Sequence, residues 1–177
     1  MSFLRRRTSA QPTNPSIVGV LRDAPLDSDA NLDEVKLPDE PVGDGIQFSA
    51  GSLDNILARH FAPGPPGSGA DQQAAAVVAA IRAYAQRPSR QRAAELEARM
   101  TVPSAREVGP LVVGALTRVA LADVAPLRNE VRAIASRTGH REVLKFCLIL
   151  LAEIGDRSDE GMLKLLARHS EFTSFAL

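Results

Sequence analysis

Apolar residues recur at helical spacing through much of the C-terminal half of the chain, most densely between Arg141 and Ile154. One set falls on one side of a predicted helix, and a second set fills most of the other side. The first set is Val143, Phe146, Cys147, Leu150, Leu151 and Ile154, and the second is Leu144, Leu148 and Ile149. A helix that is apolar nearly all round is buried all round. The pattern therefore predicts a central helix over 141–154 that other elements cover.

The same spacing predicts six further helices. They are Leu53–Phe61, Asp71–Arg87, Arg90–Met100, Ala105–Leu121, Asp123–Arg137 and Ser158–His169. Polar residues stand where N-caps are expected, and either Asp156 or Ser158 is expected to cap the last of these helices. Pro110 lacks a backbone donor inside Ala105–Leu121, so a kink or a restart is expected there. Phe172 and Phe175 are expected to fold back onto the C-terminal helix.

The N-terminal part, residues 1–44, contains five prolines and is predicted to be a largely non-helical arm. Ile17–Leu21 is a short β-prone run that could pair with Ile46–Phe48 in a small ribbon. From Asp23 to Asp44 the arm is strongly acidic, with Lys36 as its only basic residue. Such a segment either remains solvated or lies over a basic face of the same molecule.

Four regions follow from these patterns. Residues 1–44 form the acidic, proline-rich arm, and 45–62 a short extended piece plus a helix. Residues 63–70 form a Gly/Pro linker. Residues 71–177 form a helical-repeat-like domain.

A sequence repeat links two parts of that last domain. Arg106-Glu107-Val108 recurs 35 residues later as Arg141-Glu142-Val143, with the apolar runs behind them in register. Leu151–Arg157, followed by Met162–Leu166, resembles the short bacterial form of the HEAT repeat over roughly residues 104–170. The resemblance implies stacked helix pairs in which Gly155 makes the tight turn and Asp156 caps the second helix. An all-α fold is thus predicted, of HEAT/armadillo-like stacked helix pairs or of an irregular helical bundle.

The composition and charge of the chain argue against several classes of function. Aromatic residues make up 4% of the chain and the formal net charge is zero, which argues against binding to nucleic acid or an anionic membrane. No apolar run approaches the roughly 20 residues of a membrane span. Cys147 is the only cysteine, so no disulfide forms within the chain, and a cytoplasmic location is expected. The Arg- and Ala-rich composition is typical of a bacterial protein.

Few residues stand in a pattern that is typical of a catalytic or metal-binding site. His60, His140 and His169 lie at or near predicted helix ends, and none has a second ligand three or four residues away. Cys147 lies inside the apolar helix and is interpreted as a small buried hydrophobic residue. We therefore assign no catalytic, cofactor-binding or metal-binding residue, and expect neither cofactor nor enzymatic activity.

One electrostatic feature remains, a basic bias from Arg82 to Arg106. Its arginines form the candidate interaction surface: Arg82, Arg87, Arg90, Arg92, Arg99 and Arg106. The leading hypothesis is a non-enzymatic protein–protein interaction module, a helical-repeat binder or scaffold such as a small bacterial regulator or immunity-type protein. The alternative is a HEAT-like protein that binds nucleic acid through the Arg82–Arg106 face. The sequence identifies neither the partner nor the oligomeric state.

Overall fold

A computed structural model describes residues 15–24, 31–39, 69–101, 104–117 and 123–176. Every regular element in these ranges is helical, which confirms the all-α prediction. The elements are α1 (Ile17–Asp23), α3 (Gly69–Gln86), α4 (Arg90–Thr101), α5 (Ala105–Leu116), α6 (Ala125–Arg137), α7 (Arg141–Ile154), the 3-10 turn η1 (Arg157–Asp159), α8 (Glu160–Leu166) and α9 (Ser170–Ala176). None of these helices is long and apolar enough to cross a membrane.

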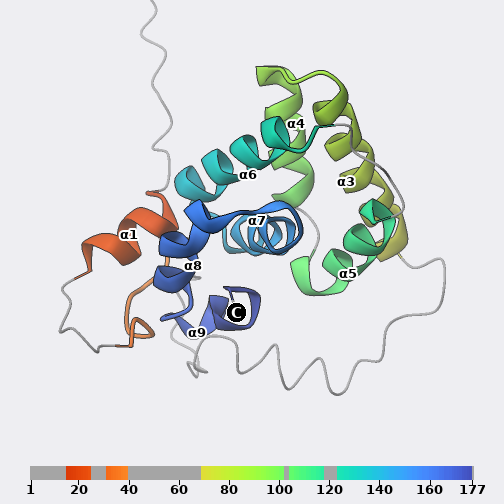
Figure 1. The fold of residues 1–177 in the computed structure, drawn as a ribbon. Helices are drawn as coiled ribbons and strands as arrows, with labels where there is room; N and C mark the ends of the chain where they lie inside the picture. Colours follow the sequence, from red (N-terminus) through yellow and green to blue (C-terminus); the bar gives the residue numbers. More distant parts are fainter. Residues whose placement is uncertain (1–14, 25–30, 40–68, 102–103, 118–122, 177) are drawn as a thin grey trace, which may run out of the picture.

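Helix α7 is the centre of the fold, as the sequence predicts. In Figure 1 it is seen nearly end-on, with the other helices arranged around it. Helices α4, α5, α6 and α9 all pack against it. Its side chains are buried in an unbroken run from Val143 to Leu148, and again at Leu150 and Leu151. The apolar surface on both sides of the helix is thereby removed from water, which is the main stabilising term in folding.

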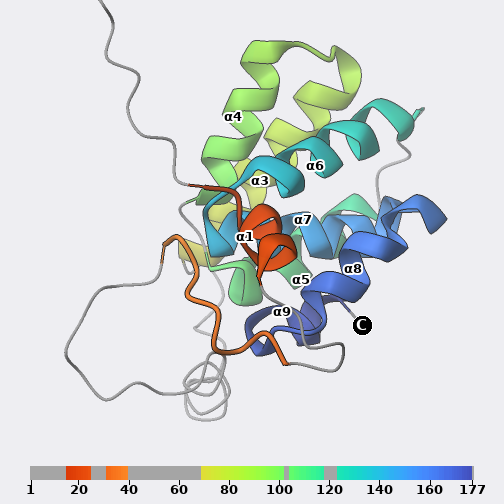
Figure 2. The ribbon, with the colours of Figure 1, turned by 90° about the vertical axis from the view of Figure 1, so that its left-hand side faces the viewer.

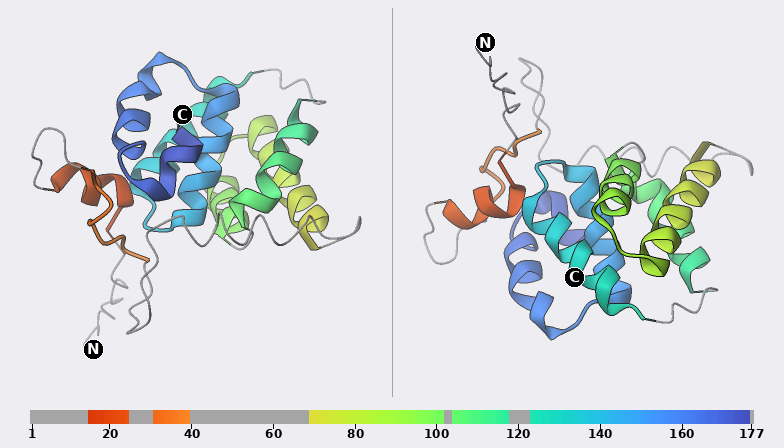
Figure 3. Two further views of the ribbon diagram at one scale, coloured as in Figure 1. Left: turned by 90° about the horizontal axis from the view of Figure 1, so that it is seen from below. Right: turned by 90° about the horizontal axis from the view of Figure 1, so that it is seen from above.

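The remaining helices form an outer layer on opposite edges of the molecule. Helix α3 packs against α4 and α5, whereas α1 packs against α6 and α8. The views from below and above place α3 at one edge and α1 at the other (Figure 3). One face of α3 therefore lies at the outside of the described fold.

The prediction of an extended run at Ile17–Leu21 is wrong, because these residues form α1. The Ser16 hydroxyl accepts a hydrogen bond from the Gly19 amide, 3.0 Å away, and so caps the helix. Ile17, Val18 and Leu21 are buried on one face of the helix. Burial of this face against α6 and α8 overrides the β preference of Ile and Val. The partner strand that we expected, Ile46–Phe48, lies outside the described residues.

Part of the acidic arm is held against the C-terminal helices. Leu32 and Leu37 are buried. Asp33 accepts a hydrogen bond from the Ser170 amide, at the start of α9, and Asp39 accepts one from the Arg141 amide, at the start of α7. Carboxylates stabilise helix N-termini, where backbone amides lack partners. Residues 31–39 are therefore anchored at two helix starts (Figure 2), and these interactions do not involve the Arg82–Arg106 surface.

Several predicted boundaries shift. Helix α3 begins at Gly69, inside the expected linker, and Pro110 lies within one continuous helix, α5, so the chain does not restart there. Helix α5 ends at Leu116, before the expected Leu121. The predicted helix Leu53–Phe61 and the linker residues 63–68 lie outside the described residues.

The turn after α7 is built from one glycine and two aspartates. A Cβ atom on Gly155 would lie 2.3 Å from the Leu151 carbonyl oxygen, so this position requires glycine. Asp156 caps the next turn, and Asp159 accepts a hydrogen bond from the Asp156 amide at 2.9 Å. Asp156, rather than Ser158, caps η1, whereas α8 itself follows Asp159 and has no side-chain cap.

An ion-pair network ties that turn to α6. Arg132 binds Asp159 and also binds Asp156 at 2.7 Å, while Arg128 lies 3.0 Å from Asp156. The Asp159 side chain is only 2% exposed. The hydrogen bond from Arg132 lowers the pKa of Asp159 and outweighs the effect of burial, which would raise it. The turn after α7 is thereby linked by charge to α6, which also packs against α7.

Substitution of Leu21 tests whether α1 belongs to the core. Leu21 is fully buried, so Leu21→Ala should lower the free energy of unfolding by about 2–5 kcal/mol, measured by urea denaturation. Arg22→Ala, at an exposed neighbouring position, should change it by less than about 0.5 kcal/mol. A similarly small effect of Leu21→Ala would contradict the packing of α1.

Acid should weaken the network at the α7–α8 turn. The folded-state pKa of Asp159 is below its unfolded value, so its stabilisation is present above about pH 4 and is lost as the pH falls toward the folded-state pKa. Asp159→Asn should lower the free energy of unfolding at pH 7 by about 2 kcal/mol, less than for a fully buried pair, because Arg132 is partly solvated.

The same variant should lose less stability than the wild type between about pH 4 and pH 2, measured by urea denaturation across that range. Glu153→Gln, at an exposed position on α7, is the control and should follow the wild-type profile. Equal acid sensitivity of the wild type and Asp159→Asn would contradict the role of this carboxylate.

Candidate functional site

A surface hollow lies between the α3–α4 turn and α6. Its volume is about 540 Å³, and we call it the Tyr84 hollow. It is lined by Tyr84, Pro88, Ser89, Arg90, Ala93, Ala94, Glu97, Glu130 and Arg137. These residues come from α3, the turn after it, α4 and α6, so the hollow forms only when three helices are packed together.

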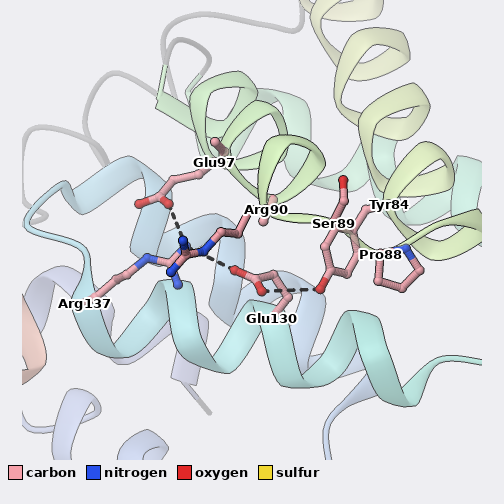
Figure 4. A pocket seen from close by; sticks show the side chains of 9 residues that line it. Tyr84, Pro88, Ser89, Arg90, Glu97, Glu130 and Arg137 are labelled. Atoms are coloured by element: carbon pink, nitrogen blue, oxygen red, sulfur yellow. Dashed lines mark hydrogen bonds and ion pairs between the residues drawn. The ribbon is translucent and has the colours of Figure 1, made fainter.

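Arg137 organises the polar side of this hollow. Its guanidinium lies between two carboxylates, 2.8 Å from Glu97 and 3.1 Å from Glu130. The Tyr84 hydroxyl donates to the other oxygen of Glu130 over 3.3 Å. Figure 4 shows Glu97 and Glu130 on either side of Arg137, with Tyr84 at the end of the row. Side chains from α3, α4 and α6 are thus joined in one network.

The α3–α4 turn beside the hollow is held by a second arginine. The Arg92 guanidinium donates to the Ala83 carbonyl, and also to the Arg87 carbonyl at 3.3 Å. Both carbonyls lie at the C-terminal end of α3, where helix carbonyls lack partners within the helix. The Ser89 hydroxyl accepts a hydrogen bond from the Arg92 amide, 3.3 Å away. These bonds hold the α3–α4 turn in place, and Pro88 and Arg90 of this region line the hollow.

The network leaves this hollow poorly equipped for acid–base chemistry. Glu97 and Glu130 each bind Arg137 through one carboxylate oxygen, and Glu130 binds the Tyr84 hydroxyl through the other. Burial, followed by the charge of Glu130, raises the pKa of Tyr84, which keeps the phenol protonated. Burial alone would lower the pKa of Arg137, but its hydrogen bonds to Glu97 and Glu130 outweigh that effect and raise it. The arrangement is a rigid polar surface.

The six arginines of the candidate interaction surface are distributed over several parts of the molecule. Arg90 lines the Tyr84 hollow, Arg82 lines a second depression between α3 and α5, and Arg92 caps α3. Arg90 and Arg92 point roughly 200° apart around α4, at about 100° per residue. Arg87 and Arg99 are exposed, and Arg106 is half-buried on α5. The spacing in the sequence could not reveal this, because the directions depend on how α3, α4 and α5 pack.

The structure separates the other candidate residues. His140 is exposed beside the start of α7, and His169 is buried, with its Nδ1 accepting from the Glu171 amide at 3.2 Å. His60 lies outside the described residues. Cys147 is fully buried, which confirms the prediction of a small core residue, and burial raises the pKa of its thiol. In the described ranges no three His, Cys, Asp or Glu residues are grouped to hold a metal ion.

A buried lysine in α7 was not predicted from the sequence. Lys145 is 3% exposed, and its ammonium binds Glu171 of α9 as well as Glu142 at 2.9 Å. Burial would lower the pKa of Lys145, but hydrogen bonds to Glu171 and Glu142 outweigh it and raise the pKa. The ammonium also lies 5.7 Å from the centre of the Phe175 ring. Lys145 is therefore a charged link that fastens α9 to α7, and a protonated amine is not a nucleophile.

No known family model matches the chain, and no curated protein or solved structure is significantly similar to it.

Titration of Tyr84 tests the network of the hollow directly. Tyr84 is the only tyrosine in the chain, so near-ultraviolet absorbance follows this phenol alone. We expect a midpoint above the ordinary value of about 10 in the folded protein and a return to about 10 in urea. Glu130→Gln should lower the folded midpoint without restoring the ordinary value, because burial persists. A wild-type midpoint at or below 10 would contradict the network.

Proposed function

We propose that this chain is a non-enzymatic protein-binding module, with the Tyr84 hollow as its main contact surface. The observation that carries the proposal is the pairing within the hollow: Arg137 holds one carboxylate on each side, and Glu130 also holds the Tyr84 hydroxyl, so paired polar side chains suited to recognition line the hollow. Tyrosine and arginine are also the residue types that contribute most to protein interfaces. Side chains already held by hydrogen bonds lose little conformational entropy when a partner binds.

The sequence repeat is the feature that favours a binder of the helical-repeat type, since the described helices themselves pack as an irregular bundle around α7. The related sequences Arg106–Val108 and Arg141–Val143 stand near the starts of α5 and α7. Each of these helices is followed by a second one, α6 or α8. HEAT-like proteins bind partners over stacked helix pairs, and by this resemblance we infer a small bacterial regulator or immunity-type protein in the cytoplasm.

The charge of the hollow indicates the chemistry of its partner. Arg137 binds both Glu97 and Glu130. Arg90, which also lines the hollow, has no ion-pair partner among the residues that the structure describes. An acidic side chain of the partner would satisfy Arg90, while a small apolar group would fit against Pro88 and Ala94. Binding of nucleic acid through Arg82–Arg106 remains the alternative; it gains no support from the separate directions of Arg90 and Arg92.

Site-specific photo-crosslinking in the source cells tests the proposal. A crosslinking residue at Ala94, inside the hollow, should give one discrete adduct with another protein. The same residue at Ala98, which is exposed on the same helix but does not line the hollow, should not. Arg90→Glu should reduce the Ala94 adduct about tenfold, because it replaces attraction by repulsion, and Arg99→Glu should leave it unchanged.

Three outcomes would contradict this function. Equal adducts from Ala94 and Ala98 would show that the hollow is not the contact surface. Loss of the adduct after nuclease treatment would support the nucleic-acid alternative. Absence of any protein adduct at Ala94 would mean that the hollow binds no protein in the cell.

A further inference from the structure

Residues 31–39 cross the C-terminal helices as a series of turns and bends, and we call this segment the strap. Leu32 of the strap is buried, and its amide donates a hydrogen bond to the Arg168 carbonyl over 3.0 Å. The next residue, Asp33, accepts a hydrogen bond from the Ser170 amide. Figure 2 shows the strap passing beside α9. The strap is therefore bonded to the chain at the point where α8 is followed by α9.

Helix α9 depends on the strap for its stability. It has 7 residues, and isolated helices shorter than about 12 residues are marginal in water. The amide of Ser170, its first residue, is bonded by Asp33, a residue of the strap. An amide in the first turn of a helix has no partner within the helix, so loss of the strap would leave the Ser170 amide without this acceptor.

The strap and α9 are also fastened to neighbouring turns of α7. Asp39, at the end of the strap, accepts a hydrogen bond from the Arg141 amide over 2.7 Å and lies 3.0 Å from the Arg141 guanidinium. One turn further along α7, Lys145 binds Glu171 of α9. Since the strap and α9 are bonded to each other as well, these links form a closed ring. Breaking one link therefore weakens the hold of the others.

The other helices depend less on this ring of links. Helix α7 also packs against α4, α5 and α6, so it keeps three neighbours when α9 leaves. Lys145 is 3% exposed while α9 covers it, and it also binds Glu142 of its own helix at 2.9 Å. Departure of Glu171 therefore leaves the ammonium with one carboxylate still bound. Parts of a fold with few buried contacts open at a lower free energy than the core.

We propose that the strap and α9 form one clasp, which opens as a unit while the other helices remain folded. Opening breaks the links at Asp33, Asp39 and Glu171 together. It uncovers the Lys145 ammonium and the side of α7 that lies beneath α9. The clasp thereby controls access to one side of the central helix. None of its residues lines the Tyr84 hollow, so this inference stands or falls independently of the proposed function.

Amine labelling of the purified full-length chain tests whether the clasp opens. The reagent is an acetyl ester of N-hydroxysuccinimide, used at about pH 8, and peptide mass spectrometry follows each amine separately. The chain contains only three lysines, namely Lys36, Lys145 and Lys164. The Lys164 side chain is 76% exposed and serves as the internal standard. We expect Lys145 to be labelled slowly, at a rate set by opening of the clasp.

Two neighbouring substitutions in the strap provide the test and its matched control. Asp33→Ala removes the acceptor of the Ser170 amide and should raise the labelling rate of Lys145 about fivefold, the usual effect of a lost helix cap. Glu34→Ala changes an exposed residue of the same segment and should leave that rate unchanged. The labelling rate of Lys164 should be the same in both variants and in the wild type.

Hydrogen exchange provides a second readout of the clasp as a unit. The amides of Leu32, in the strap, and Phe172, in α9, both donate hydrogen bonds and should exchange with one opening constant. The amide of Leu148 in α7 should exchange more slowly, because the central helix remains folded. Glu171→Gln, a change in α9, should speed exchange of the Leu32 amide in the strap. Glu153→Gln, at an exposed position of α7, should not.

Three results would overturn the proposal. Labelling of Lys145 only as fast as global unfolding, which the Leu148 amide reports, would show that the clasp does not open separately. Faster exchange of Leu32 in Asp33→Ala with unchanged exchange of Phe172 would show that the strap opens alone. Unchanged exchange of Leu32 in Glu171→Gln would show that α9 opens without the strap.

Discussion

The need to cover one apolar helix governs this structure. Helix α7 is buried at nearly every position from Val143 to Leu151, so no single neighbour can shield it, and α4, α5, α6 and α9 pack around it. Its few polar groups are accommodated by pairing. Lys145 binds two glutamates, and Glu142 also accepts a hydrogen bond from the Ala105 amide at the start of α5, 2.7 Å away. These links fix α5 and α9 in place at the same time as they neutralise charge in the core.

The positions of the helices that cover α7 also determine where the Tyr84 hollow forms on the surface. Because α4 and α6 both pack on the central helix, Glu97, Glu130 and Arg137 meet at the edge between them and form one wall of the Tyr84 hollow. Helix α3 packs mainly on α4 and α5 rather than on α7. One stripe of α3 is left outward, and it carries small and oppositely charged residues. The Tyr84 hollow therefore arises where two helices that pack on α7 meet the end of α3.

Sequence reasoning located the features that depend on local pattern. The span of α7 and the cap at Asp156 agree with the prediction, because periodicity and capping are properties of neighbouring residues. It was wrong at Ile17–Leu21, where burial of one face against α6 and α8 outweighed β propensity. It also could not find the pair Lys145–Glu171, whose partners meet only when α9 returns to α7. The candidate arginines were chosen by their proximity in the sequence, but Arg82, Arg90 and Arg92 point to three different places once α3 and α4 are packed.

Hydrogen exchange of backbone amides, measured in the folded chain, tests the central position of α7 most directly. If this helix is enclosed by the others, the amides of residues 145–151 should exchange only through global unfolding, and therefore more slowly than those of the exposed face of α4. Exchange of these α7 amides at a rate equal to that of α4 would contradict the account.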